Sequence, residues 1–391
     1  MDDLLKWRSE FPILENSTYL ISNSLGAMPR AVYERLHDYA EMWATRGVRA
    51  WEESWWEMAV SVGDKAGAII GAGPGEISLH QNVTLTQAII SSCFEFSAPR
   101  NKVVLTDLEF PSTVYFWMEQ RRSGARVEIL ESPDGLHAPL EKLLESIDET
   151  TMLVPISLVF FRSSTLVDAR AIIDRAHQAG AHVILDCFQA SGTVPVNVRE
   201  LEVDFAVGGV LKWLCGGPGV SYLYVRPDLR AKLRPKISGW LAHRRPFAFE
   251  VGALDARSDA YRFLNGTPHI PALYACQPGL EIIAQVGVDR IREKSVRQTS
   301  RLIESASKRG WRINSPRDAR ERGGTVSIDC PHAQEVKSEL IARNILVDYR
   351  PGAGIRISPH FYNRDEEIDF ALAQIDEILA TRAWERHWQP A

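Results

Sequence analysis

Two charged residues lie in apolar surroundings, where a charge is costly. Asp186 ends the run AHVILD (181–186), and Lys212 lies inside VLKWL (210–214), directly before the glycine-rich turn CGGPG (215–219). The aspartate could meet a cationic ring nitrogen or a metal, or it could simply cap the next turn. Burial would lower the pKa of the lysine and make its amine nucleophilic, unless the side chain extends to solvent.

The order of these two residues favours one chemistry. An aspartate at the end of one β-like run, followed by a lysine that leads into a glycine turn, is typical of a pyridoxal-phosphate enzyme. In such an enzyme the lysine forms a Schiff base with the cofactor, and the aspartate keeps the pyridine nitrogen protonated so that the ring accepts electrons. The pair therefore predicts pyridoxal 5′-phosphate as the cofactor.

Short apolar runs alternate with helical patterns in the middle of the chain. We predict strands over 102–110, 126–132, 150–160, 181–188, 204–210 and 221–227. Runs rich in Val, Ile and Leu that are separated by helices predict an α/β fold, with a mostly parallel sheet and helices on both faces. Ligands of such a sheet bind beyond the carboxyl ends of its strands.

The chain changes character after about residue 275. A long helical pattern is followed by strands near TVSIDC (325–330) and GIRISP (354–359), and then by a closing helix, which predicts a smaller α+β domain. We expect an N-terminal segment (1–40) that packs on this small domain, a large cofactor-binding domain (41–270) and the small domain itself (271–391).

The bulk composition excludes several classes of protein. The 391 residues carry a formal net charge of −5, with 45% hydrophobic and 24% charged residues, which is ordinary for a globular protein and argues against a nucleic-acid surface. The five cysteines form no C-x-x-C pair, so neither a zinc site nor a disulfide framework is expected. No stretch approaches the roughly 20 apolar residues that span a bilayer, and the N-terminus lacks a signal-peptide core. We expect a cytoplasmic protein without a membrane partner.

Seven segments, in order, resemble the class V group of fold-type I pyridoxal-phosphate enzymes, and kynureninases in particular. They are YLISNSLGAMP (19–29), LEFPSTVYF (108–116), DCFQASGTVPVNV (186–198), LKWLCGGPG (211–219), SGWLAH (238–243), RFLNGTP (262–268) and GIRISPHFYN (354–363). The resemblance covers nearly the whole chain. It implies an aminotransferase-like fold, an α-amino acid as substrate and a homodimer with shared active sites.

The resemblance also implies roles for single residues. Lys212 would hold the cofactor and carry the proton at the substrate α-carbon, and Arg356 would clamp the α-carboxylate. Asn23 and Ser24 would line the substrate pocket. The other residues expected to bind the cofactor are Val83 and Thr84 at its phosphate, Phe110 on the face of its ring, Asp168 near the ring substituents, Asp186 at the ring nitrogen, Gln189 at the 3′-oxygen, and Trp240 and Asn265 from the partner subunit.

Simpler interpretations remain for four of these residues. Phe110 could be a core residue, Thr84 and Asp168 could be helix caps, and Arg356 could be one of the many surface arginines.

Two positions depart from the kynureninase pattern. Gln189 stands where kynureninases have a histidine, and Leu211 stands where they have a tyrosine that helps to bind phosphate and to transfer a proton. The glutamine is typical of cysteine desulfurases. Those enzymes, however, stack a histidine where this chain has Phe110, and they need a nucleophilic cysteine that VDYRPGAGIRIS (347–358) does not contain.

Despite these two departures, the resemblance implies kynureninase-like hydrolysis of a Cβ–Cγ bond. Another class V reaction, such as transamination, β-elimination or epimerisation, is the main alternative. A non-catalytic cofactor-binding protein is a third, because the hydroxyl before Lys212 is missing.

Overall fold

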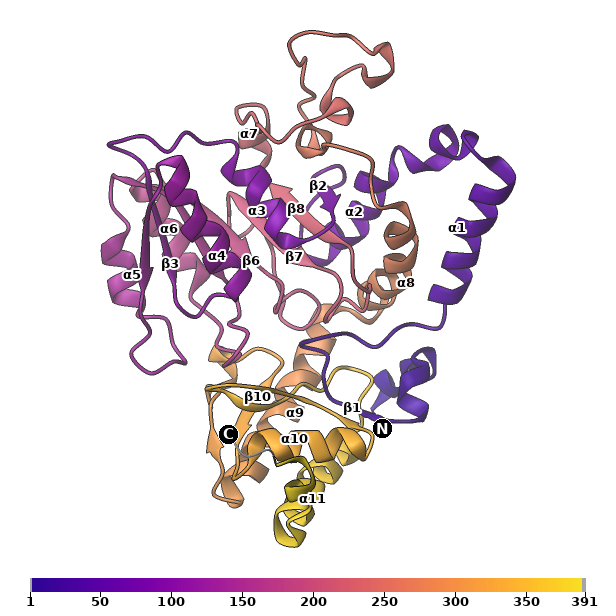
Figure 1. Ribbon diagram of the computed structural model, residues 1–391, viewed down its shortest axis with the longest axis vertical. Coiled ribbons are helices and arrows are strands. Elements are labelled where there is room, and N and C mark those ends of the chain that lie inside the picture. Colours follow the sequence, from indigo (N-terminus) through magenta and orange to yellow (C-terminus); the bar gives the residue numbers. More distant parts are fainter. Residues whose placement is uncertain (1, 389–391) are drawn as a thin grey trace.

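A seven-stranded sheet forms the centre of the upper part of the computed structural model, which describes residues 2–388 (Figure 1). The strands, in spatial order, are β2 (Ile77–His80), β8 (Ser221–Val225), β7 (Phe205–Gly209), β6 (His182–Asp186), β5 (Thr151–Ser157), β3 (Lys102–Thr106) and β4 (Arg126–Leu130). Only the pairings of β8 are antiparallel, so six of these seven strands point the same way. The predicted, mostly parallel sheet is confirmed.

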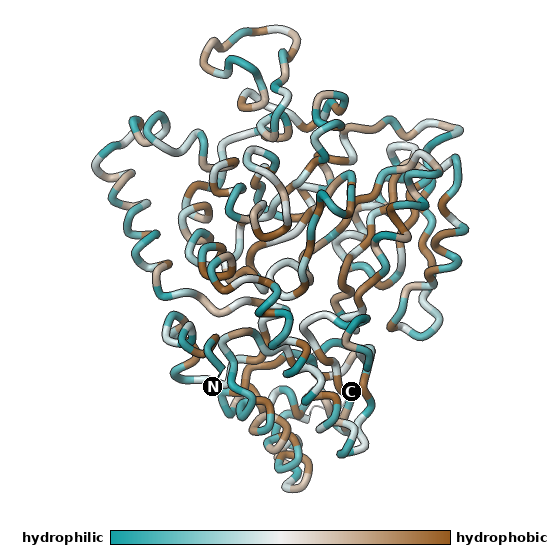
Figure 2. Tube along the Cα trace, turned by 180° about the vertical axis from the view of Figure 1, so that it is seen from behind, coloured by the Kyte–Doolittle hydropathy of each residue, from teal (hydrophilic) through white to brown (hydrophobic). Residues whose placement is uncertain are grey.

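Helices cover both faces of this sheet, which confirms the predicted α/β fold. One face packs against α2 (Met58–Ile69), α5 (Leu140–Ser146), α6 (Ala169–Gln178) and α8 (Ile270–Val286). The other packs against α3 (Val83–Ser91) and α4 (Pro111–Glu119). Within β6, Val183 and Leu185 face the first side and Ile184 faces the second, so the strand is apolar at successive positions. Figure 2 shows hydrophobic segments gathered in the interior and hydrophilic ones on the outer helices.

A smaller sheet lies below the large one in Figure 1. Its antiparallel strands are β12 (Asp348–Arg350), β13 (Gly354–Ile357), β10 (Val326–Asp329) and β9 (Arg312–Ile313). The helices α9 (Val288–Lys308), α10 (Ala333–Ala342) and α11 (Asp365–Thr381) pack on it around a separate apolar core. This arrangement confirms the predicted smaller α+β part of the fold.

The N-terminal segment contacts both parts of the molecule. Strand β1 (Thr18–Tyr19) pairs in parallel with β11 (Ile345–Leu346) beside the small sheet, and Arg8 forms an ion pair with Glu367 of α11 at 2.9 Å. The next helix, α1 (Val32–Arg46), packs instead on α8 next to the large sheet. The expected boundary at residue 40 thus falls inside a helix.

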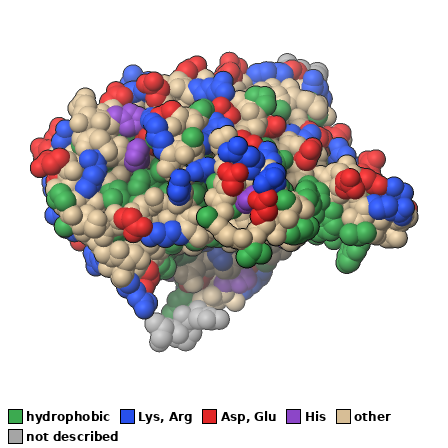
Figure 3. All heavy atoms as spheres, turned by 90° about the horizontal axis from the view of Figure 1, so that it is seen from above, with side chains coloured by type: hydrophobic (Ala, Val, Ile, Leu, Met, Phe, Trp, Pro, Cys, Tyr) green, Lys and Arg blue, Asp and Glu red, His purple; other side chains and the backbone are tan. Residues whose placement is uncertain are grey.

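The outer surface is mixed in charge. On the face in Figure 3, acidic and basic side chains alternate without one sign dominating. Among residues 2–388, no helix combines the length and the apolar character needed to cross a membrane.

A buried carboxylate ties together the amino-terminal ends of β6 and β7, the two strands that lead to Asp186 and Lys212. Asp204 is fully buried and accepts hydrogen bonds from Val183 N–H at 2.8 Å and from the rings of His177 and His182 at 3.0 Å each. Burial alone would raise the pKa of Asp204, but these hydrogen bonds outweigh it and hold the pKa below its usual value.

Asp204→Asn should lower the free energy of unfolding by about 3 kcal/mol, because the amide removes the buried negative charge and one of the two acceptor oxygens that the surrounding donors use. Urea unfolding followed by tryptophan fluorescence measures this loss. Because the folded-state pKa is lowered, the advantage of the native protein should be full at neutral pH and should shrink as the pH falls below about 4. The control is Asp174→Asn, at an exposed position on α6; an equal loss in both variants would contradict the prediction.

Candidate active site

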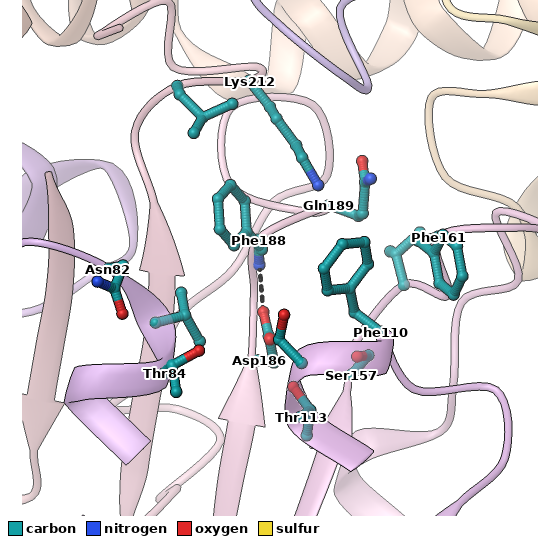
Figure 4. A pocket seen from close by; sticks show the side chains of 14 residues that line it. Asn82, Thr84, Phe110, Thr113, Ser157, Phe161, Asp186, Phe188, Gln189 and Lys212 are labelled. Carbon is teal, nitrogen blue, oxygen red and sulfur yellow. Dashed lines mark hydrogen bonds between the residues drawn. The ribbon is translucent and has the colours of Figure 1, made fainter. Parts of the chain in front are cut away.

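The central pocket lies beyond the carboxyl ends of β5, β6 and β7. Ser157 and Asp186, the last residues of β5 and β6, are register partners, so both side chains lie at one edge of the sheet. Strand β7 ends at Gly209 and leads to Lys212. The lining residues are Asn82, Val83, Thr84, Phe110, Ser112, Thr113, Ser157, Val159, Phe161, Asp186, Phe188, Gln189, Leu211 and Lys212 (Figure 4). Most of the surface that these residues expose to the pocket is apolar.

Asp186 provides a buried carboxylate that faces the pocket (Figure 4). Its Oδ1 accepts the backbone N–H of Phe188 at 2.8 Å. Burial raises the pKa of Asp186 to about 6, although this hydrogen bond and the charge of Lys212 act in the opposite direction. The carboxylate is therefore suited to a cationic partner that enters the pocket.

Lys212 extends into the same pocket from the other side. Its Nζ lies 4.3 Å from the ring centroid of Phe188 and 5.7 Å from that of Phe110. Burial lowers the pKa of Lys212 to about 8, and the negative charge of Asp186 partly opposes this shift. A lowered pKa gives a larger share of free, nucleophilic amine near neutral pH.

The N-terminal segment supports the lysine loop. Gly26 N–H donates to the carbonyl oxygen of Leu211 at 2.8 Å. A Cβ atom at Gly26 would lie 2.1 Å from the Lys212 carbonyl oxygen, so only glycine permits this approach. The motif NSLG (23–26) thus has a steric reason to end in glycine.

An anion site is available at the amino-terminal end of α3. Val83 and Thr84 begin this helix and line the pocket, and Asn82 caps it by accepting Leu85 N–H at 2.9 Å. The free backbone N–H groups of a first helical turn attract phosphate. Because Asn82 is the cap, the alternative interpretation of Thr84 as the N-cap is wrong.

Aromatic side chains form two walls of the pocket. Phe110 is 46% exposed and meets Phe161 edge to face, with ring centroids 5.2 Å apart. Phe110 is therefore not a core residue, and its exposed ring is free to cover a planar ligand. Phe188 lines the opposite side (Figure 4) and packs against Gly209, where an added Cβ would lie 2.2 Å from its Cζ.

Gln189 and Asn23 lie together beside the pocket. Gln189 Nε2 donates to the backbone carbonyl oxygen of Asn23 at 3.0 Å, and Gln189 Oε1 accepts from Trp213 Nε1 at 3.1 Å. The side-chain amide of Asn23 is buried, and neither of its polar atoms has a hydrogen-bond partner within residues 2–388. A buried, unpaired amide is costly, so a ligand that pairs with it would be stabilised. Ser24, the next residue, is half-buried.

Arg356 is buried on β13 and is not a surface charge. Its Nε donates to Asp348 Oδ1 at 2.7 Å, and its Nη2 donates to Asp348 Oδ2. Its Nη1 donates to the carbonyl oxygen of the pocket residue Phe161 at 2.5 Å.

Besides Asn23, Ser24 and Arg356, three more predicted residues do not line this pocket. Asp168 is exposed and caps α6 by accepting Ala171 N–H at 3.0 Å, so the prediction that it lies beside the cofactor ring is wrong. Trp240 packs edge to face on Trp56, and Asn265 lines a separate cavity. The expected roles of Trp240 and Asn265 need a second subunit and stay predictions.

Several residues of the site were not predicted from the sequence. Ser157, Thr113 and Phe188 line the pocket, and the rule that strand ends carry ligands could have found Ser157.

Glu109 is buried next to Ser157 and accepts its backbone N–H at 2.8 Å. Burial raises the pKa of Glu109 to about 8, and the nearby charge of Asp186 adds to the shift.

These groups fit pyridoxal 5′-phosphate. The apolar walls suit a planar ring, the buried Asp186 suits a protonated ring nitrogen, and the start of α3 suits a phosphate. Lys212, whose Nζ lies near the rings of Phe110 and Phe188, supplies an amine that could form an imine bond with the aldehyde of the cofactor. The chemistry of the donors thus agrees with the cofactor predicted from the sequence.

The chain is similar to known proteins along most of its length. The family model described as aminotransferase class-V matches residues 18–370. Kynureninase from Pseudomonas fluorescens is 29% identical over 399 residues, with 98% of this chain and 94% of the relative covered. The uncharacterized aminotransferase YcbU from Bacillus subtilis is 30% identical, with 96% and 97% covered.

Solved structures resemble this chain more closely in fold than in sequence. An apo cysteine desulfurase from Thermococcus onnurineus NA1 has a TM-score of 0.85 at 21% identity, with 96% of this chain and 98% of that chain covered. At this identity the likeness concerns the fold alone. The family match shows that the chain belongs to the class V aminotransferase family, a group of pyridoxal-phosphate-dependent enzymes, and the likeness to the solved structure agrees with fold type I.

Proposed function

We propose that this enzyme acts on an α-amino acid and hydrolyses the Cβ–Cγ bond of a kynurenine-like substrate. The observation that carries the proposal is that Lys212, Asp186 and the Arg356–Phe161 contact converge on one largely apolar pocket. An amine, a ring-nitrogen acid and a carboxylate-binding cation are the groups that an amino-acid reaction on this cofactor requires. Similarity to kynureninases along nearly the whole chain supports the choice of reaction.

The chain's own residues would divide the work as follows. When bound, pyridoxal phosphate supplies an electron-accepting ring next to the substrate α-carbon. Asp186 would hold the proton-bearing ring nitrogen, and Lys212, released as a free amine, would take and return the proton at the α-carbon. Phe110 and Phe188 would cover the ring and exclude water. Hydrolysis of kynurenine would then break the Cβ–Cγ bond and give 2-aminobenzoate and alanine.

The pocket walls also support an aromatic substrate. Phe161 and Val159 extend the apolar lining beyond Phe110, and apolar and aromatic walls favour a flat hydrophobic side chain.

Transamination is the second candidate, because Leu211 supplies no hydroxyl for proton transfer next to Lys212. Similarity to the uncharacterized aminotransferase YcbU is as high as that to the kynureninases and supports this alternative.

Lys212→Arg should abolish the covalent link to the cofactor, because a guanidinium keeps the charge but cannot form the imine. Borohydride reduction followed by peptide mass spectrometry should locate the added cofactor mass on Lys212 in the native protein and nowhere in the variant. The control is Lys232→Arg, at an exposed position. Retention of the link in Lys212→Arg would contradict the assignment.

The attachment of the cofactor to apoprotein should accelerate with pH, reach half of its maximum rate near pH 8 and level off above it, because burial lowers the pKa of Lys212 to about 8 and only the free amine reacts. Stopped-flow absorbance between pH 6 and pH 10.5 measures this profile. Asp186→Asn removes a charge that raises this pKa, so the midpoint should move to lower pH. A midpoint near that of an ordinary lysine would show that the amine is not desolvated.

Incubation of the holoenzyme with L-kynurenine should release 2-aminobenzoate and alanine in equal amounts, because hydrolysis divides the substrate at one bond. Fluorescence and amino-acid analysis quantify the two products. Lys212→Arg serves as the inactive control. Absence of both products, with conversion of the cofactor to its amine form by other amino acids, would favour transamination.

A further inference from the structure

Asp348 is built into the fold directly opposite Arg356. The two residues are cross-strand partners on β12 and β13, and both are buried. Antiparallel partners hold their Cβ atoms about 5 Å apart, so the two side chains are forced to meet. They do so through two parallel hydrogen bonds, from Nε to Oδ1 and from Nη2 to Oδ2. The orientation of the guanidinium is thus set by the register of the small sheet.

The hydrogen bonds of Arg356 leave a defined pair of donors. A guanidinium carries five N–H groups. Two point at Asp348, and one on Nη1 points at the carbonyl oxygen of Phe161. One N–H on Nη1 and one on Nη2 remain, which is the number that a carboxylate accepts in a bidentate contact. Because Phe161 lines the central pocket, the contact with its carbonyl oxygen brings the guanidinium to the pocket wall.

The charges around Asp348 are not balanced. Arg350 also approaches this carboxylate, with Nη2 at 3.3 Å from Oδ2, although its own side chain is 40% exposed. Two guanidinium groups therefore share one carboxylate, and the cluster keeps one net positive charge. That charge lies close enough to Lys212 to help lower the pKa of the lysine, after the larger effect of burial. A buried cluster of this kind is stabilised by one more anion.

We propose that Asp348 is the positioning residue of the substrate-binding site: it orients Arg356 so that the two remaining N–H groups receive the substrate α-carboxylate. Asp348 touches neither the substrate nor the cofactor in this arrangement, and it acts only through Arg356. The inference rests on the proposed function, since it takes an α-amino acid as the ligand of Arg356.

The test compares two ligands that differ only in the carboxylate, L-alanine and L-alaninamide, with the holoenzyme. Binding is followed by the cofactor's absorbance, and α-proton exchange in D₂O is followed by NMR. In Asp348→Asn the Kd for alanine should rise about 10- to 100-fold, because a misoriented fork loses a charge-assisted contact. The Kd for alaninamide should stay within about 3-fold, and so should the exchange rate at saturating alanine.

A matched control separates this role from a general effect on the small sheet. Asp329→Asn makes the same substitution at an exposed position on β10 of the same sheet, and it should leave both Kd values unchanged. If Asp348→Asn does not fold, Asp348→Glu keeps the charge and moves the carboxylate by one methylene, and the same loss for alanine alone is expected.

Equal weakening of both ligands, or a fall in the exchange rate with an unchanged Kd for alanine, would overturn the role of Asp348. The proposed function would be overturned by a different result, in which the native holoenzyme binds alanine and alaninamide equally well. In that case Arg356 itself would not be the carboxylate site.

Discussion

The burial of an acid and an amine around one cavity is the constraint on which the site depends. Burial raises the pKa of Asp186 to about 6 and lowers that of Lys212 to about 8, so both groups are moved toward neutral pH from opposite directions. Neither shift would be stable in a flexible protein, because water would enter and restore the ordinary values. The two-sided packing of β6 and β7 and the aromatic walls limit the access of water to these two groups.

The fold supplies that rigidity at both ends of the strands. At one end, Asp204 gathers the histidines and a backbone N–H of β6 around a single carboxylate. At the other end, Ser157 and Asp186 are the last residues of their strands, and Lys212 follows β7 after a short turn, so that all three line the cavity. The chemistry lies where regular hydrogen bonding stops, because only there do side chains and free N–H groups face a ligand.

Local patterns made part of this structure predictable. Asp186 and Lys212 stand out because a charge inside an apolar run has few explanations, and the parallel sheet follows from strands that are apolar at successive positions. The position of Asp168 could not be decided from the sequence, because a helix cap and a ring-binding aspartate can have the same local sequence. The Asp348–Arg356 pair was beyond reach for another reason: their contact depends on the register of β12 and β13, which no single residue reveals. Trp240 and Asn265 depend on a second chain.

The N-terminal segment has a mechanical consequence. Residues 18–26 pair with β11 beside the small sheet at one end and hydrogen-bond to Leu211, next to Lys212, at the other. They therefore connect the part of the molecule that carries Arg356 with the part that carries Lys212. A shift of one part strains this segment unless the other part follows, so the spacing between Arg356 and Lys212 is held by a third piece of chain as well as by their own domains.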